Sequence, residues 1–167
     1  MGQRGFSGTG LILHWDGHAW SKSLELTSPG YGPNYALFGV WGSGSTDVWA
    51  VGQNCPADSY GYAEWYQCTY SALHWNGAAW SSATLPKEIG SLNGVWGSGP
   101  CDVWAVGAST FDNVDASTVM QPRIVHWDCK AWSDASDSRV HGALRAVGGG
   151  GPGDVWAAGD DGIFHHS

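Results

Sequence analysis

Histidine and aspartate recur at regular places along this chain, and both are suited to metal binding or acid–base catalysis. The recurring residues are His14, His74 and His126, each followed by tryptophan, and Asp47, Asp102 and Asp154, each followed by Val-Trp-Ala. A metal site or catalytic dyad needs such side chains close together in space. Equivalent positions of successive repeats lie far apart unless they line a common axis, so the recurrence favours a structural role. We expect each histidine to bridge its strand to a neighbouring turn or tryptophan, and each aspartate to cap a turn.

The remaining residues contain no recognisable catalytic motif. No non-repeating pair of acids stands out as a glycosidase site. No Ser-His-Asp elbow, phosphate loop or nicotinamide fingerprint is present. Residues 148–151 are glycine-rich, but no helix is expected after them to hold a phosphate. The sequence therefore predicts no enzyme activity, no cofactor and no metal.

Two sequence motifs alternate along the chain. The first motif, with the pattern Gly-Val-Trp-Gly-Ser-Gly-x-x-Asp-Val-Trp-Ala-Val-Gly, occupies residues 39–52 and 94–107, with a divergent copy at 146–159. The second motif, with the pattern His-Trp-Asp/Asn-x-x-Ala-Trp, occupies residues 14–20, 74–80 and 126–132, and a further copy begins near residue 162. The repeated aspartates of the first motif are 55 and 52 residues apart. A period near 50 residues with several short strands predicts a β-propeller.

Each repeat is expected to contain four strands, which we name A to D. In the central part of the chain the predicted bounds are 91–97 for A, 102–107 for B, 72–75 for C and 79–84 for D. Asp-Gly and Asn-Gly between strands C and D predict type I′ turns, in which both central residues have positive φ. Strand B reads Val-Trp-Ala-Val without polar alternation, which predicts a strand covered on both faces.

These patterns predict an all-β chain of about three four-stranded blades in one repeat domain, residues 10–167. The predicted repeats are 10–36, 37–90, 91–142 and 143–167. The sequence opens and ends on strand C, and propellers have four to eight blades. Three blades are not expected to close alone. Two alternatives follow: two chains build one ring of about six blades, or the chain is a fragment of a longer propeller.

The motifs resemble those of known propeller families. Val-Trp-Ala-Val-Gly, Gly-x-Ile-x-His and Trp-Asp-Gly-x-x-Trp resemble tectonin-type propeller lectins, the bacterial neuraminidase repeat and photosystem assembly-factor propellers. The resemblance covers residues 10–165 and implies the fold. The Asp box of the neuraminidase repeat has Ser or Thr before its Asp and a residue between Asp and Gly, whereas His14-Trp15-Asp16-Gly17 does not. The resemblance therefore implies no enzyme activity.

Composition excludes several partner classes. The net charge is −8, with 15 acidic against 7 basic residues, which argues against nucleic acid and anionic membranes. No apolar run approaches the length that spans a bilayer. Residues 1–10 contain one arginine and no apolar core, so no signal peptide is recognised in them.

The four cysteines lack the close spacing of zinc sites, so disulfides are favoured over a metal. Cys55 and Cys68 are at the two ends of an insertion and are expected to form a bond that closes it. Cys101 and Cys129 are in the predicted A–B and C–D turns of one blade and are candidates for a second bond. Cys129 replaces a turn glycine, which is costly at positive φ unless something compensates. Disulfides in turn predict a secreted or cell-surface protein.

Three segments depart from the repeat: residues 53–70, 27–36 and 108–122. Strand alternation brings them to one rim, and binding residues concentrate on such loops. The repeated tryptophans are read mainly as packing, although Trp20, Trp80 and Trp132 could stack on sugars. The candidate ligand-binding residues are Trp65, Tyr62, Tyr66, Tyr60, Tyr31 and Tyr35, with Trp65 first because it belongs to neither motif.

We therefore expect a binding module rather than a hydrolase. A carbohydrate-binding, lectin-like propeller is the first hypothesis, and a protein-interaction or assembly scaffold is the alternative. The expected partners are a glycan or protein ligand, together with either further copies that complete a ring or the remainder of a longer chain.

Overall fold

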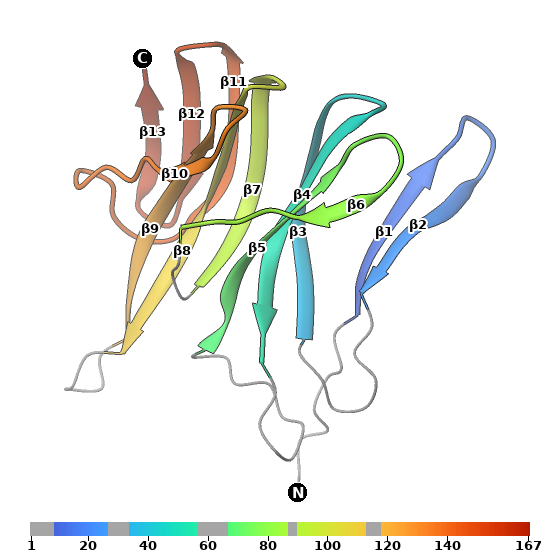
Figure 1. Ribbon diagram of the computed structural model, residues 1–167. Helices are drawn as coiled ribbons and strands as arrows, with labels where there is room; N and C mark the ends of the chain where they lie inside the picture. Colours follow the sequence, from blue (N-terminus) through green and yellow to red (C-terminus); the bar gives the residue numbers. More distant parts are fainter. Residues whose placement is uncertain (1–8, 27–33, 57–66, 87–89, 113–117) are drawn as a thin grey trace, which may run out of the picture.

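The protein is an all-β molecule in the computed structural model, which describes residues 9–26, 34–56, 67–86, 90–112 and 118–167. The described residues form antiparallel strands and turns without an α-helix. The same residues therefore include no helix long and apolar enough to cross a membrane. Figure 1 shows the strands as four sheets that follow one another in chain order.

The four sheets, numbered I to IV in chain order, each consist of strands that are consecutive in sequence. Sheet I contains β1 (Gly10–Trp15) and β2 (Trp20–Leu26). Sheet II contains β3 (Asn34–Gly44), β4 (Asp47–Cys55), β5 (Thr69–Trp75) and β6 (Trp80–Ser82). Sheet III contains β7 (Gly90–Gly99), β8 (Asp102–Asp112), β9 (Thr118–Trp127) and β10 (Trp132–Asp134). Sheet IV contains β11 (Leu144–Gly151), β12 (Asp154–Gly159) and β13 (Gly162–His166).

The all-β prediction is confirmed, but the expected three four-stranded sheets are not what the described residues form. They form two sheets of four strands, one of three and one of two. The reason is the register of the repeat along the chain. Sheet I contains only the second motif, and sheet IV contains the first motif followed by one further strand.

Several strands extend further than the repeat predicts. The pairing of β8 with β9 continues past Gly107↔Arg123 to Asp112↔Thr118. Much of the predicted loop 108–122 is therefore a hairpin extension. Its Ser-Thr-Phe and Thr-Val-Met runs favour extended backbone, which explains the longer ladder.

The turns between predicted strands C and D are four-residue loops and not type I′ turns. In sheet I, Trp15 pairs with Trp20, so residues 16–19 form the loop. Gly17 has a φ of 100°, while Cys129 is the only non-glycine residue with positive φ in the described chain. The Asp16 side chain accepts backbone N–H bonds from His18 and Ala19 at 2.7 and 2.8 Å. This capping by the side chain removes the need for positive φ at Asp16.

The first strands of sheets II, III and IV, which are β3, β7 and β11, lie next to one another. β7 packs against both β3 and β11. Small residues permit this approach: a Cβ atom on Gly39 would lie 3.2 Å from the backbone nitrogen of Val95, and one on Gly94 would lie 3.2 Å from Cα of Ala146.

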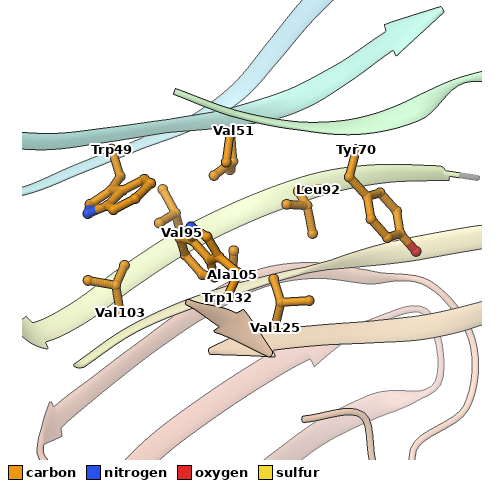
Figure 2. Packing of buried hydrophobic residues seen from close by; sticks show 10 residues of the cluster. Trp49, Val51, Tyr70, Leu92, Val95, Val103, Ala105, Val125 and Trp132 are labelled. Atoms are coloured by element: carbon orange, nitrogen blue, oxygen red, sulfur yellow. The ribbon is translucent and has the colours of Figure 1, made fainter. Parts of the chain in front are cut away.

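The main core fills the space between sheets II and III (Figure 2). Trp49 and Val51 of β4 face Leu92 and Val95 of β7, and Trp132 of β10 covers the outer side. Residues 49–52 of β4 are all buried, which confirms that this B strand is covered on both faces.

Candidate functional site

The repeated histidines and aspartates form pairs in sheets II, III and IV. The distances between aspartate Oδ1 and histidine Nε2 are 2.6 Å for Asp47–His74, 2.8 Å for Asp102–His126 and 2.9 Å for Asp154–His165. Each aspartate begins the second strand of its sheet, and each histidine lies on the third strand. The pairs therefore bridge strand and turn, as the sequence predicts.

Each paired histidine also lies against the tryptophan of the adjacent strand. The ring centroids are 4.3 Å apart for Trp49–His74, 4.3 Å for Trp104–His126 and 4.1 Å for Trp156–His165. The contact follows from register, because each tryptophan is paired with its histidine across the ladder. Side chains paired in this way project to the same face of the sheet.

The hydrogen bonds around these pairs do not have the order of a catalytic triad. Ser43 Oγ donates to Asp47, and Ser98 Oγ donates to Asp102. The hydroxyl thus contacts the carboxylate and not the imidazole, which would have to take its proton in nucleophilic catalysis. The arrangement can hold a turn against a strand, but it does not activate the serine.

The Asp102 carboxylate is stabilised in its charged form. Burial raises its pKa, but hydrogen bonds from Ser98, His126 and Trp104 outweigh this effect, so the pKa lies below its usual value. Trp104 Nε1 donates to Asp102 Oδ1 at 2.8 Å. These donors are side chains, so Asp102 secures its turn through side-chain hydrogen bonds.

His14 is different from the other repeated histidines. It lies on β1, and sheet I contains no strand equivalent to β4, β8 or β12. Within the described part of the chain no aspartate forms a hydrogen bond with the His14 ring, although its own tryptophan pair is present: the Trp15 and Trp20 rings are 5.7 Å apart. The predicted bridge is therefore absent for this histidine.

Both predicted disulfides are present. Cys55 and Cys68 are bonded across a Cα–Cα distance of 3.9 Å, and both are buried. Cys101 and Cys129 are bonded with Cα atoms 4.5 Å apart. Cys129 has a φ of 72°, so the bond compensates for the unfavourable backbone that the sequence predicts at this turn position.

The rim predicted to bind ligand is described only where its segments join the strands. The inserted segments leave β4 and β8 and re-enter at β5 and β9, at the lower end of Figure 1. Tyr35 lies in β3 opposite Asn54, where it is half-buried. The other candidate residues lie outside the described residues: Trp65, Tyr62, Tyr66, Tyr60 and Tyr31.

Sequence reasoning missed the exposure of Trp156, which was expected to be packing, yet 46% of it is exposed. Trp20, for which packing was favoured and stacking on sugars was left open, is 66% exposed. A cleft of about 460 Å³ lies between sheets III and IV, and another of about 540 Å³ lies between sheets I and II. The signal was available, because both tryptophans occupy repeat positions whose neighbouring sheet is incomplete.

Comparison with protein-family models, with curated proteins and with solved structures found no match to the chain. Among the residues that the structure describes, no group of three or more histidine, cysteine, aspartate or glutamate side chains could hold a metal ion.

Proposed function

We propose that the chain is a non-catalytic, carbohydrate-binding module of the β-propeller type. The stacked repeat sheets with adjacent inner strands support the propeller. The observation that carries the binding proposal is the anchoring of the 53–70 segment. The Cys55–Cys68 bond closes this insertion at the end of the molecule from which the extended β8–β9 hairpin also projects. A rigid scaffold that carries variable segments at one end is a common design for binding sites.

The chemistry of the segment favours a sugar ligand. Residues 53–70 contain four tyrosines and Trp65, which offer apolar faces for sugar rings and hydroxyl groups for hydrogen bonds. The net charge of −8 disfavours polyanionic ligands and leaves neutral glycans as the matching class.

A glycan array followed by titration with a soluble sugar tests this proposal. Trp65→Ala should abolish binding and leave the melting temperature within a few degrees, while Trp65→Phe, which keeps an aromatic face, should retain most of it. Loss of several kcal/mol of stability in Trp65→Ala, as in buried tryptophan truncations, would instead make Trp65 part of the loop's own core.

A protein-interaction module is the second candidate, and the exposed tryptophans of the end sheets favour it. Apolar patches of this kind mark protein contacts. An array without bound glycans, together with a protein ligand whose affinity falls on changing rim residues, would support this candidate over the first.

The proposed location is secreted or at the cell surface. Two disulfides are compatible with an oxidising, extracellular environment. Fractionation of the native cells should recover the protein in the extracellular or cell-surface fraction, with no free thiols on unfolding without reductant; recovery in the intracellular fraction with four free thiols would contradict this location.

A further inference from the structure

The end sheets expose tryptophans that equivalent positions bury in the middle of the molecule. Trp20 and Trp132 both begin the last strand of the second motif, yet 66% of Trp20 is exposed against 5% of Trp132. Trp156 and Trp49 occupy the same place in the first motif, and their exposed fractions are 46% and 1%. The repeat therefore builds a packing surface on each end sheet that the described residues leave exposed.

The interface between sheets II and III shows what these surfaces contact when they are covered. The Trp49 ring of sheet II lies 5.2 Å from the Trp127 ring and 5.0 Å from the Trp132 ring of sheet III. Thus one sheet supplies a tryptophan and the next supplies a tryptophan pair to receive it. Val95 of sheet III is also buried there, with 9% exposed.

In the cleft between sheets I and II, sheet II presents the same kind of surface with which sheet III packs against Trp49. The lining of the cleft includes Trp75, Trp80, Val40 and Val48 of sheet II, which are the repeat equivalents of Trp127, Trp132, Val95 and Val103 in sheet III. Val40 is 66% exposed, in contrast to 9% for Val95. No tryptophan equivalent to Trp49 reaches this pair from sheet I, because sheet I contains only the second motif.

In the cleft between sheets III and IV the single tryptophan is present, and the tryptophan pair that would pack against it is absent among the described residues. Trp104 lines the cleft and lies 5.3 Å from the ring of His166, the position that corresponds to Trp127. Sheet IV has no fourth strand among the described residues, so no equivalent of Trp132 packs beside Trp104. The missing side chains are a tryptophan pair on a hairpin.

The β1–β2 hairpin carries such a pair: Trp15 and Trp20 are 47% and 66% exposed, and both also border the cleft between sheets I and II. Leu13 and Trp15 are 50% and 47% exposed and are the repeat equivalents of Val125 and Trp127. The hairpin also carries His14, which is without the aspartate that its equivalents contact. In Figure 1 this hairpin and sheet IV lie at opposite ends of the molecule, so a contact between them requires a second copy.

We propose that the β1–β2 hairpin of one copy pairs with β12 of a second copy in place of that copy's β13, and that the exchange is reciprocal. The hybrid sheet then has four strands, as sheets II and III do. Its Trp20 fills the cleft beside Trp104, and its Trp156 enters the cleft between sheets I and II. Two copies form a closed ring with six complete sheets. The proposal rests on repeat packing and goes beyond the proposed ligand.

The competing strand β13 is the weaker partner for β12. It has five residues, carries histidine at position 166 where the motif has tryptophan, and leaves Ile163 72% exposed. Asp154, which contacts His165 in this molecule, would contact His14 of the second copy, in the register that joins Asp102 to His126. The exchange therefore keeps the strand pairing of β12. It gives up the packing of Phe164 against the cluster that contains Val106 and Leu144, and in return it covers the exposed rings of Trp20 and Trp156.

The disulfide of sheet III provides an experiment in which the register is already known. Cys101 directly precedes Asp102, and Cys129 directly follows Asp128; their Cα atoms are 4.5 Å apart. The matching positions of the hybrid sheet are Gly153 and Gly17, and a Cβ atom at either one would have no neighbour within 4 Å. Gly17→Cys/Gly153→Cys in the full chain should therefore form a disulfide-linked dimer, seen by non-reducing electrophoresis and mass spectrometry of the linked peptide.

The matched control is Thr46→Cys/Gly77→Cys. These positions are the sheet II equivalents of Cys101 and Cys129, and Thr46 is the direct neighbour of Gly77, so the bond should form within one chain and leave the protein monomeric on the gel. Each single variant, Gly17→Cys and Gly153→Cys, should give no dimer alone, and a refolded mixture of the two should. A Gly17/Gly153 variant that stays unlinked while the control is bonded, with a one-chain mass in light scattering, overturns the proposal.

Two further variants distinguish strand exchange from simple stacking of intact sheets. Trp20→Ala should weaken dimer formation about tenfold or more, as loss of a central aromatic does. Met120→Ala should not, because Met120 is an exposed apolar residue (44%) that lies on β9 opposite Thr110, outside both end sheets. Phe164→Pro disrupts β13 pairing and should favour the dimer, because it removes the competitor. A dimer weakened by Phe164→Pro would contradict the exchange, since stacking alone requires β13 in place.

Discussion

The interfaces on the two sides of sheet III use the same repeat positions but are filled differently. Between sheets II and III, Trp49 is enclosed by Trp127 and Trp132. Between sheets III and IV, Trp104 keeps its histidine and aspartate contacts but lies beside a cleft of about 460 Å³. The repeat motif therefore determines contacts within each sheet, whereas burial depends on the sheet that follows. Local order and core stability are thus separable properties of this molecule.

The largest expected effect is at Trp49. Trp49→Ala should lower the free energy of unfolding by about 3–5 kcal/mol, because it removes a fully buried aromatic from the core. Trp104→Ala should cost less than half as much in dilute protein, because one side of its ring already faces a cleft. Urea denaturation of both variants at low concentration measures the difference. Equal losses of unfolding free energy in the two variants would show that the two interfaces are equally packed, which would contradict the difference described above.

The second effect concerns the turns of sheets II and III, of which only those of sheet III are joined by a disulfide. Cys101→Thr/Cys129→Gly places at these two positions the residues found at the equivalent positions of sheet II, Thr46 and Gly77. Loss of a crosslink spanning 28 residues should lower the free energy of unfolding by about 3–4 kcal/mol. Replacing Cys129, which has a positive φ, with glycine should raise it by about 1 kcal/mol. Denaturation should therefore show a net loss of about 2–3 kcal/mol. A variant as stable as the parent would mean that the bond adds nothing to a turn that the repeat already holds.

The sequence was sufficient to predict what a single sheet determines. The all-β class, both disulfides, and the contacts that join His74 and His126 to a turn and a tryptophan follow from spacing within one repeat, and all three are present. That the partner in the turn is the repeated aspartate was not predicted. The shape of the C–D loops was wrong, because side-chain capping by Asp16 replaces the two positive φ angles of a type I′ turn. Propensity for Asp-Gly could not reveal that alternative.

Features between sheets were harder to predict. The exposure of Trp156 depends on what packs against sheet IV and not on its own motif, which is almost the same as that of Trp49. The same reason explains the exposed face of β1–β2. The ligand-binding predictions all remain predictions, and of their residues only Tyr35 lies among those described.

The third effect compares the aspartates of sheets III and IV through pH. The pKa of Asp102 is lowered in the folded protein, so its stabilising effect is fully present above the usual pKa of 3.8 and is lost as pH falls through the lower folded value. Asp102→Asn should cost about 1–3 kcal/mol at neutral pH, and the gap to the parent should narrow below about pH 4.

The comparison residue is Asp154, whose pKa is lowered by hydrogen bonds from Trp156 and His165 but whose side chain is 51% exposed. Asp154→Asn should change stability in the same direction and by less. Denaturation curves between pH 2.5 and 7 measure both. A gap for Asp102→Asn that widens toward low pH would refute the assigned sign, and a larger effect at Asp154 would refute the role of burial.

The smallest effect tests how sheet I is held on sheet II. Trp80 Nε1 donates a hydrogen bond to Ser23 Oγ at 2.9 Å, and this bond joins β6 to β2 across the cleft of about 540 Å³. Ser23→Ala should lower global stability by about 1 kcal/mol or less, because the core between sheets II and III does not depend on it. Its clearer signature is local: amide exchange in β1–β2 should accelerate while exchange in β4 and β8 stays unchanged. Faster exchange in all sheets alike would show that sheet I unfolds together with the core, whereas a selective change identifies the hairpin as the separately mobile element that exchange between copies requires.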